Sequence, residues 1–252
     1  MKVTVVTVCY NSRETIAECI QSVISQEYVD VEYIIVDGQS SDGTVQIIEK
    51  SAREQKSKIR FISEKDNGIY DAMNKGIRMA SGDVVGFLNA DDFFADNSVI
   101  GNLIDSFKSG AVDIVYGDID IIYDREDRKV IRSWKSGKYN HRALKFGWHP
   151  PHPAFYMRRG LFESLGGFDL AVGLSADYDL MIRALMASGN RVAYLNQVLV
   201  KMRHGGASTS GLRPVLRGWV TCQLPWQKIS RPYAGLMAAT LKPLRKIFQV
   251  RL

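Results

Sequence analysis

Residues 84–92 read VVGFLNADD and change from apolar to oxygen-rich within a few positions. The apolar run at the start of this segment predicts a buried strand. Asn89, Asp91 and Asp92 follow the run, and carboxylates this close repel one another unless a cation or a hydrogen-bond donor lies between them. Ligands of open α/β sheets bind outside the carboxyl ends of the strands, so the turn predicts a site for a divalent ion and a phosphorylated ligand. The alternative is a solvated acidic turn that caps a helix beginning near Asn97.

Strand-like and helix-like segments alternate through the first 89 residues. A helix capped by Asn11 follows the first strand. The expected strands cover residues 3–8, 33–36, 59–62 and 84–88, and the later helices cover residues 44–55 and 69–80. Repeated βαβ units form a parallel sheet with right-handed crossovers. We therefore expect one edge of the sheet to gather the residues that follow the strands, namely Tyr10, Asp37, Asp66 and Asp91.

The second half of the chain predicts further strands and helices around an antiparallel hairpin. Prolines 150, 151 and 153 predict an extended loop, because proline disfavours helix in the residue before it. Ser175 is the expected cap of a helix over residues 176–188. The other expected elements are a helix at 98–107, strands at 113–116, 154–157, 192–195 and 198–202, and a hairpin of 119–123 with 130–134.

The composition is that of a globular protein. The chain has 252 residues, of which 46% are hydrophobic and 24% charged, enough for one sizeable core. Its three cysteines show no ligand spacing, which argues against a zinc site or a disulfide framework. The N-terminus lacks the layout of a secretory signal, so we expect a cytoplasmic protein.

Charge is divided unevenly along the chain. Residues 1–179 carry 21 basic and 27 acidic residues, whereas the last 73 residues carry 12 basic and no acidic residues. Residues 212–252 mix these cations with aromatic side chains, which predicts a basic, amphipathic segment on an anionic membrane surface. The alternatives are a helix packed on the sheet and a nucleic-acid partner. The acidic remainder of the chain and the lack of an RNA-binding signature argue against nucleic acid.

Several motifs accompany the acidic turn in a fixed order. They read VTVCYN at 6–11, IVDGQSSDGT at 35–44, DNGIYDAMNKG at 66–76, FLNADD at 87–92, GGFD at 166–169 and ADYDL at 176–180. Together they resemble the family 2 glycosyltransferases, most closely those of bacterial exopolysaccharide and colanic-acid-like synthesis. The resemblance implies a GT-A fold, a mixed and mainly parallel α/β sheet flanked by helices. It also implies inverting sugar transfer from a nucleotide-sugar to a hydroxyl.

The resemblance assigns the donor site to residues at the sheet edge. The donor-nucleotide residues it implies are Thr7, Tyr10, Asp37, Asp66, Asn89 and Asp91. Asp91 occupies the family's metal-binding position, so Mg²⁺ or Mn²⁺ is the expected cofactor and a UDP- or GDP-sugar the expected donor. Asn89 stands where the family pattern has an aspartate, which removes one negative charge from the metal site.

The resemblance assigns the acceptor site to the second half of the chain. Asp177 matches the family's catalytic base, with Ala176 where glutamate is frequent, and Asp179 is the alternative base. Trp148 and His152 are the expected acceptor contacts, and a metal role for His152 together with His149 is a further alternative.

These observations predict a glycosyltransferase domain over residues 1–211, followed by the membrane-associating segment 212–252. Residues 1–95 are the expected nucleotide-sugar half and 96–211 the acceptor half. The expected acceptor is a polyprenyl-diphosphate-linked saccharide at the inner face of the cytoplasmic membrane. The Gly-rich phosphate-binding loops of dehydrogenases and nucleotidyltransferases are missing after the first strand. A non-catalytic membrane partner with this fold remains the alternative, because of Asn89 and Ala176.

Overall fold

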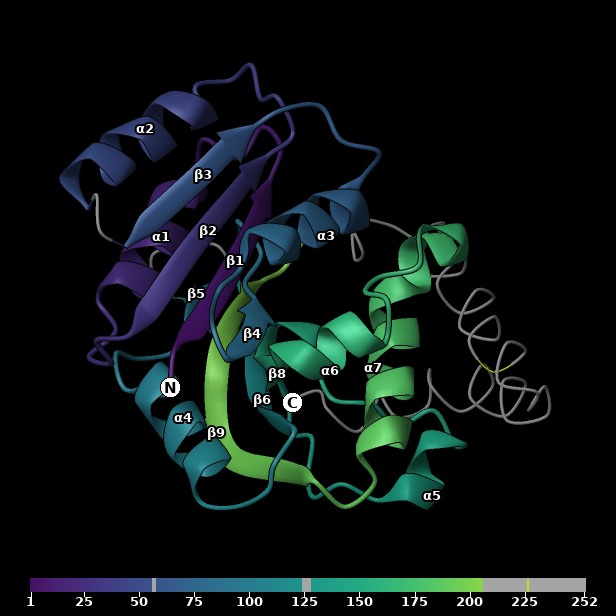
Figure 1. The fold of residues 1–252 in the computed structure, drawn as a ribbon. Coiled ribbons are helices and arrows are strands. Elements are labelled where there is room, and N and C mark those ends of the chain that lie inside the picture. The colour runs from purple at the N-terminus through teal and green to yellow at the C-terminus, as the bar shows by residue number, and fades with distance from the viewer. Residues whose placement is uncertain (56–57, 124–127, 206–225, 227–252) are drawn as a thin grey trace.

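The computed structural model describes residues 1–55, 58–123, 128–205 and Trp226 (Figure 1). The strands are β1 (Val3–Cys9), β2 (Val31–Asp37), β3 (Ile59–Ser63), β4 (Val84–Phe87), β5 (Phe93–Phe94), β6 (Ile114–Ile122), β7 (Val130–Trp134), β8 (Phe155–Arg158) and β9 (Val192–Arg203). The helices are α1 (Ile16–Ile24), α2 (Thr44–Glu54), α3 (Ile69–Met79), α4 (Val99–Lys108), α5 (His141–Leu144), α6 (Arg159–Ser164) and α7 (Ala176–Ser188), with 3-10 turns η1 (His152–Ala154) and η2 (Leu170–Ser175).

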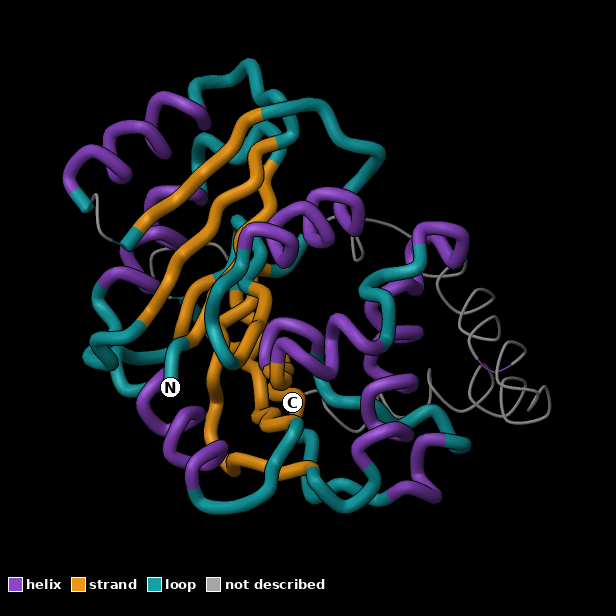
Figure 2. Tube along the Cα trace, viewed as in Figure 1, coloured by secondary structure: helices purple, strands orange, loops and turns teal. Residues whose placement is uncertain are grey.

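Within the described residues, one sheet contains all the strands, in the order β3-β2-β1-β4-β8-β6-β9-β5, with β7 paired to β6 (Figure 2). Strands β1 to β4 run parallel, as the βαβ pattern predicts, and β8 enters antiparallel between β4 and β6. Cys9 pairs with Asp37, and Asp37 pairs with Ser63, so β1, β2 and β3 end side by side. The predicted common edge is therefore confirmed.

Helices cover both faces of the sheet because the strand side chains are apolar on both sides. Val6 and Val8 of β1 belong to the cluster that contains α3, α6 and α7, whereas Val3 and Val5 belong to the cluster that contains α1, α2 and α4. Figure 1 shows these helices on opposite sides of the sheet. The alternation along each strand produces the three-layer α/β arrangement.

Two glycines allow close packing at the centre of the sheet. A Cβ added to Gly76 of α3 would lie 2.4 Å from Val6 Cγ1, and one added to Gly86 of β4 would lie 2.2 Å from the Tyr156 ring. Real Cβ atoms do not approach other atoms so closely, so both positions require glycine. Gly86 thereby lets Tyr156, on the antiparallel strand β8, lie against β4 where the two halves of the sheet join.

The structure corrects three local expectations. Asn11 does not cap α1: its φ is +49° and its side chain accepts from the Ser41 amide, so it bridges two loops. The separate strands expected at 113–116 and 119–123 are one continuous strand, β6. The separate strands expected at 192–195 and 198–202 are likewise one strand, β9. Ser175 does precede α7, whose predicted bounds are confirmed, although its side chain makes no capping hydrogen bond.

The predicted segment 212–252 lies outside the described residues except for Trp226. Among the residues that are described, no helix combines the length and apolar character needed to cross a bilayer.

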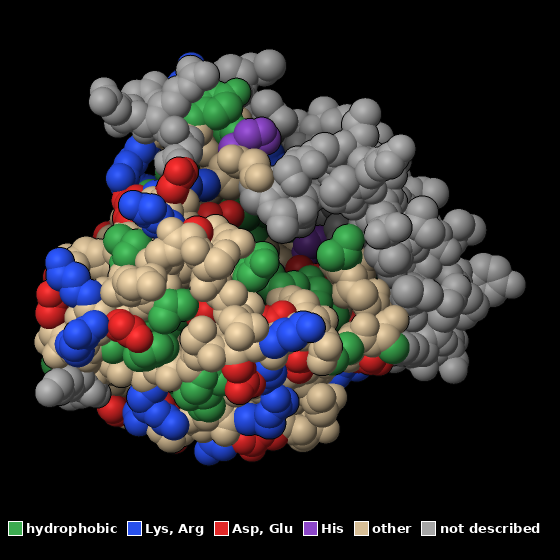
Figure 3. All heavy atoms as spheres, turned by 90° about the horizontal axis from the view of Figure 1, so that it is seen from above, with side chains coloured by type: hydrophobic (Ala, Val, Ile, Leu, Met, Phe, Trp, Pro, Cys, Tyr) green, Lys and Arg blue, Asp and Glu red, His purple; other side chains and the backbone are tan. Residues whose placement is uncertain are grey.

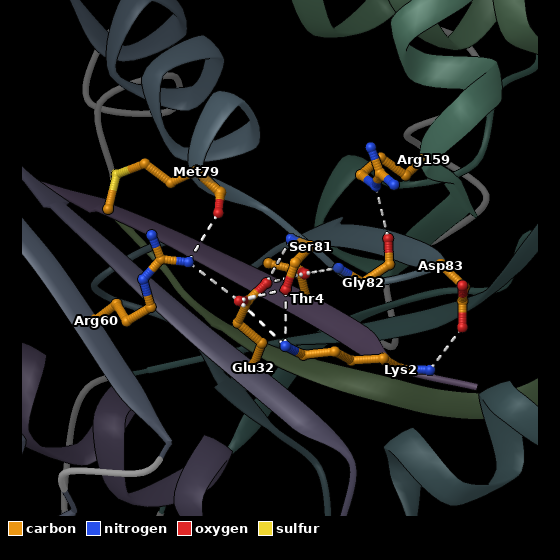
Figure 4. A network of polar contacts seen from close by, with 9 residues as sticks. All are labelled: Lys2, Thr4, Glu32, Arg60, Met79, Ser81, Gly82, Asp83 and Arg159. Carbon is orange, nitrogen blue, oxygen red and sulfur yellow. Dashed lines mark hydrogen bonds and ion pairs between the residues drawn. The ribbon is translucent and has the colours of Figure 1, made fainter.

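A buried acid, Glu32, links the strands at their amino ends, opposite to the end that carries the predicted site (Figure 4). Glu32 of β2 is 6% exposed and accepts hydrogen bonds from Thr4 Oγ1 at 2.7 Å and from the Ser81 amide at 2.7 Å. Lys2 and Arg60 lie 3.3 and 3.2 Å from its Oε1. Burial alone would raise the pKa of Glu32, but the donors of Ser81 and Thr4 outweigh it and lower the pKa to about 2. The charged carboxylate therefore joins β1, β2, β3 and the start of β4.

We predict that Glu32→Gln destabilises the protein by about 2–3 kcal/mol at pH 7, because a depressed carboxyl pKa stabilises the fold above the pKa of the unfolded chain. This contribution disappears as the pH falls from about 4.5 towards about 2. Urea unfolding of both proteins between pH 7 and pH 3 measures the difference. Glu163→Gln, at a 53% exposed ion pair, is the matched control and should change stability by less than about 1 kcal/mol. A Glu32→Gln difference that is the same at pH 7 and pH 3 would contradict this account.

Candidate active site

An exposed aromatic ring and a carboxylate meet at the carboxyl edge of the sheet. Tyr10, directly after β1, is 66% exposed. A Cβ added to Gly38, directly after β2, would lie 2.7 Å from Asp66 Oδ2 and 3.4 Å from Tyr10 Cδ2. Asp66 also accepts from the Gly68 amide at 2.8 Å. The bare Gly38 backbone thus brings Tyr10 and Asp66 together, and an exposed ring beside a carboxylate suits a nucleoside, which offers a face for stacking and groups that donate hydrogen bonds.

Asp37 lies at the same edge but serves the protein's own loops. Its side chain is fully buried and accepts from the Ser40 amide at 2.9 Å and from Ser63 Oγ at 2.7 Å. It therefore fixes the loop after β2 to β3. The structure brings Asp37 to the predicted place, while its carboxylate is already occupied by these donors.

Thr7 does not reach the edge. Its side chain is fully buried, and its hydroxyl accepts a hydrogen bond from Tyr33 Oη at 3.0 Å and contacts Cys19 Sγ at 3.6 Å. Because side chains alternate along β1, Thr7 faces α1 rather than the open end of the strands. The Thr7 side chain is thus engaged inside the protein, and its role in donor binding stays a prediction.

The acidic turn after β4 is held by a distant arginine. Asn89 Nδ2 donates to Asp92 Oδ2 at 2.9 Å. Arg203, the last residue of β9, donates from its backbone to Asp92 at 3.3 Å and from its guanidinium to the Asp91 carbonyl at 2.6 Å. Arg203 also pairs with Glu18 of α1. The sequence carries no signal for this role of Arg203, because nothing near the turn indicates a partner that lies in the last strand.

The two carboxyl groups of the turn differ in exposure. Asp92 is fully buried, whereas Asp91 is half-buried. Burial raises the pKa of Asp91, and burial together with the Asp91 charge raises that of Asp92 well above its usual range. The Asp91 carboxylate accepts from its own backbone amide, whereas the Asp92 carboxylate accepts from Asn89 and Arg203, so Asp91 is the more available of the two for a cation.

The donor set at this turn fits a hard divalent ion only in part. No group of three or more His, Cys, Asp or Glu side chains within the described residues is arranged to hold a metal. Mg²⁺ and Mn²⁺ in phosphate-handling sites take one or two carboxylates and complete their shell with phosphate oxygens and water. Asp91 meets that requirement together with a diphosphate ligand.

Asp177 lies in the first turn of α7. The Tyr70 hydroxyl, from α3, donates to the Leu174 carbonyl at 3.2 Å and lies within reach of the Asp177 side chain. Burial and the Asp177 charge raise the pKa of Tyr70, which keeps the phenol protonated. Asp177 is half-buried, so its carboxylate is open to a ligand.

His152 also lies near Asp177. Its ring stacks on Phe87 with 5.4 Å between centroids and lies edge-on to Phe168 at 5.8 Å. Burial lowers the pKa of His152, and the Asp177 charge opposes this. Its Nε2 is buried without a hydrogen-bond partner. Figure 3, which looks onto this side of the molecule, shows acidic, histidine and hydrophobic side chains around a hollow.

Asp179 is excluded as the base by its position. It is 1% exposed and pairs with Arg183 at 2.7 Å. Arg183 in turn donates to the carbonyls of Leu165 and Gly167 at 2.7 and 2.8 Å. The pair therefore holds α7 against the loop after α6.

Asn74 of α3 holds the same loop from the other side. Its Nδ2 donates to the Phe168 carbonyl at 2.9 Å, and the Phe168 amide donates to its Oδ1 at 3.0 Å. Gly167 has a φ of +73°, and a Cβ there would lie 2.7 Å from Asn74 Oδ1. The motifs at 66–76 and 166–169 thus contact each other. Their contact links the nucleotide side of the sheet to the helix that carries Asp177.

Trp148 belongs to the core and not to an open pocket. It is 9% exposed, and its indole donates to the Ser136 carbonyl at 2.8 Å. The predicted acceptor contact by Trp148 is not supported by this geometry. His149 contacts the Pro150 carbonyl through Nδ1 at 2.9 Å, and the described residues show no metal cluster that includes it. The alternative of a His149–His152 metal site is therefore not supported.

A mainly parallel sheet flanked by helices, with an exposed aromatic ring and an acidic turn after its strands, has the architecture of the GT-A glycosyltransferases. The family model for Glycosyl transferase family 2 matches residues 4–166. The chain therefore belongs to glycosyl transferase family 2.

Known proteins agree with this membership. A PGL/p-HBAD biosynthesis glycosyltransferase of Mycobacterium bovis is 29% identical over 202 residues, which cover 79% of this chain and 76% of the relative. S. aureus TarS 1-349 in complex with UDP-GlcNAc superposes with a TM-score of 0.70 at 18% identity, over 91% of this chain and 66% of that one. The mannosyltransferase PcManGT of Pyrobaculum calidifontis, in complex with GDP-Man and Mn²⁺, gives a TM-score of 0.64 at 18% identity, over 100% and 76% of the two chains.

Proposed function

We propose that the protein transfers a hexosyl or N-acetylhexosaminyl group, with inversion, from a nucleotide-diphosphate sugar to a hydroxyl of a saccharide acceptor. The product would belong to a bacterial surface polysaccharide or glycolipid. The observation that carries the proposal is the set of contacts that links α3 to the loop before α7 and to the first turn of α7, because it ties the Asp177 carboxylate to a helix that packs on the parallel strands of the donor half. We infer that Asp91 and Asp177, which lie on separate elements, act on the diphosphate and on the acceptor hydroxyl of one transfer.

The donor half suits a nucleoside diphosphate. The neighbouring structures contain UDP-GlcNAc and GDP-Man, which supports a UDP- or GDP-sugar as the donor. In this chain Tyr10 would stack on the base, and Asp66 would accept hydrogen bonds from the base or the ribose. Asn89 already donates to Asp92, so it shapes the turn and leaves Asp91 to face the diphosphate.

The acceptor half supplies the base. Asp177 would take the proton of the acceptor hydroxyl as its oxygen attacks the anomeric carbon. Attack from the side opposite the diphosphate inverts the configuration of that carbon. The Tyr70 hydroxyl, which lies within reach of the carboxylate, would orient it. A Mg²⁺ or Mn²⁺ ion held by Asp91 would neutralise the negative charge that develops on the departing diphosphate.

We predict that Asp177→Asn lowers kcat by about 100-fold or more and leaves nucleotide affinity within about twofold, because the base acts on the acceptor and not on the donor. Asp91→Ala should instead abolish the part of UDP or GDP binding that depends on Mn²⁺. Calorimetry with UDP and GDP measures binding. Nucleotide release from UDP-GlcNAc and GDP-Man, with polyprenyl-diphosphate-linked saccharides present, measures turnover. Asp105→Asn, at a side chain that is 78% exposed, is the control and should change neither quantity.

If Asp177→Asn has the same kcat as the wild type, Asp177 is not the catalytic base. A wild-type chain that binds a nucleotide-sugar but never transfers the sugar would favour the alternative, a non-catalytic partner in a polysaccharide assembly complex. Two residues motivate that alternative: Asn89, which reduces the charge of the metal site, and Ala176, which is fully buried where the family often has glutamate.

We further propose that the acceptor is lipid-linked and that residues 212–252 hold the protein on the inner face of the cytoplasmic membrane. Their basic and aromatic composition supports this, since cations bind anionic headgroups and aromatic rings enter the interface. Replacing the Lys and Arg of this segment by Gln in the full-length chain should abolish co-sedimentation with anionic vesicles, while neutral vesicles bind neither protein. Unchanged sedimentation of the variant would contradict membrane attachment by this segment.

A further inference from the structure

Trp226 lies in the segment expected at the membrane, yet its side chain is buried in the protein. It is 1% exposed and belongs to the cluster formed by α3, α6 and α7. Its indole N–H donates to Tyr178 Oη at 3.1 Å. Its burial sets Trp226 apart from the aromatic side chains expected at a membrane surface. A buried tryptophan with its N–H paired is a packing anchor.

The partner of Trp226 is the residue next to Asp177. Tyr178 is 2% exposed, and its ring lies edge-on to His149, with 5.1 Å between centroids and 75° between planes. His149 in turn lies edge-on to Trp134 of β7, at 5.1 Å and 76°. Trp226 thus joins a chain of aromatic contacts that runs from the first turn of α7 through the proline-rich loop to the hairpin strand.

The first turn of a helix depends on contacts from outside the helix, because its backbone amides have no partners in a preceding turn. Asp177 and Tyr178 both belong to this turn. The Tyr178 side chain points into the core, where Trp226 meets it, while Asp177 is open to the site. A shift of Tyr178 would therefore move the Asp177 carboxylate relative to the donor.

We propose that Trp226 is a positioning residue for Asp177, so that the acceptor half of the enzyme extends beyond residue 211 and includes this side chain. The inference rests on the proposed function, since it assigns Trp226 a part in the same transfer. It separates two roles within residues 212–252: Trp226 completes the active site from inside the fold, and the charged residues of the segment contact the membrane.

The variants Trp226→Phe, Tyr178→Phe and their double mutant test the proposal, because each removes one polar group and keeps an aromatic ring. We expect each single variant to lower kcat by about three- to tenfold with nucleotide affinity unchanged, and the double mutant to lose no more than either single variant. Hydrogen–deuterium exchange should be faster at residues 176–180 in all three variants. Tyr28→Phe is the matched control, since it removes a hydroxyl that donates to the Met1 carbonyl, outside the cluster that contains α7.

Exchange at residues 176–180 equal to that of the wild type, or a kcat that stays at the wild-type value while only the melting temperature falls, would overturn the positioning role. Losses that add in the double mutant would show that Trp226 and Tyr178 act independently, which also overturns it. If the wild type itself shows no turnover, the proposed function fails, and the exchange data still decide whether Trp226 holds the first turn of α7.

Discussion

The paired hydrogen bonds between Asn74 and the backbone of Phe168 are the constraint on which the active site depends. Asn74 lies on α3, which packs on the parallel strands that end at the nucleotide side. Phe168 lies in the loop that leads to η2 and α7. An asparagine side chain can donate and accept at once, so a single residue fixes both the amide and the carbonyl of Phe168. Tyr70, one helical turn earlier, donates to the Leu174 carbonyl and lies beside Asp177.

Further contacts around this link hold α7 in place. Arg183 binds Asp179 and the carbonyls of Leu165 and Gly167, which secures the loop from the side of α7. Gly167 adopts a positive φ and leaves room for Asn74, so a larger residue there would push α3 and the loop apart. The position of α7 therefore depends on backbone positions that the asparagine, the arginine and the glycine set together.

The pKa values of buried acids shift in opposite directions at the two ends of the parallel strands. At the amino edge, Glu32 is surrounded by donors and cations, which lower its pKa to about 2 and stabilise its charge. At the carboxyl edge, burial raises the pKa of Asp91 and Asp92, because Arg203 compensates only part of their charge. Groups with perturbed pKa values concentrate at functional sites. A cation at Asp91 would supply the missing compensation, which is the physical reason for placing the donor diphosphate there.

The sequence predicted what depends on local pattern, and it missed what depends on distant contacts. Hydrophobic periodicity gave the parallel strands, the bounds of α7 and the common edge of Tyr10, Asp37, Asp66 and Asp91. The strand that contains Thr7 was also predicted. The face of the sheet on which Thr7 lies was not, because it depends on which helices pack on each side. The roles of Arg203, Trp148 and Trp226 follow from partners far along the chain, for which the local sequence carries no signal.

The most direct measurement is the effect of Asn74→Ala on kcat and on nucleotide affinity, with Asn102→Ala, a substitution of the same kind on α4, as the control. If the link between α3 and Phe168 sets the distance from base to donor, kcat falls by about 10- to 100-fold while the Kd for the nucleotide stays within about twofold. An Asn74→Ala enzyme with wild-type kcat, or one that loses nucleotide affinity in proportion to its activity, would contradict the account.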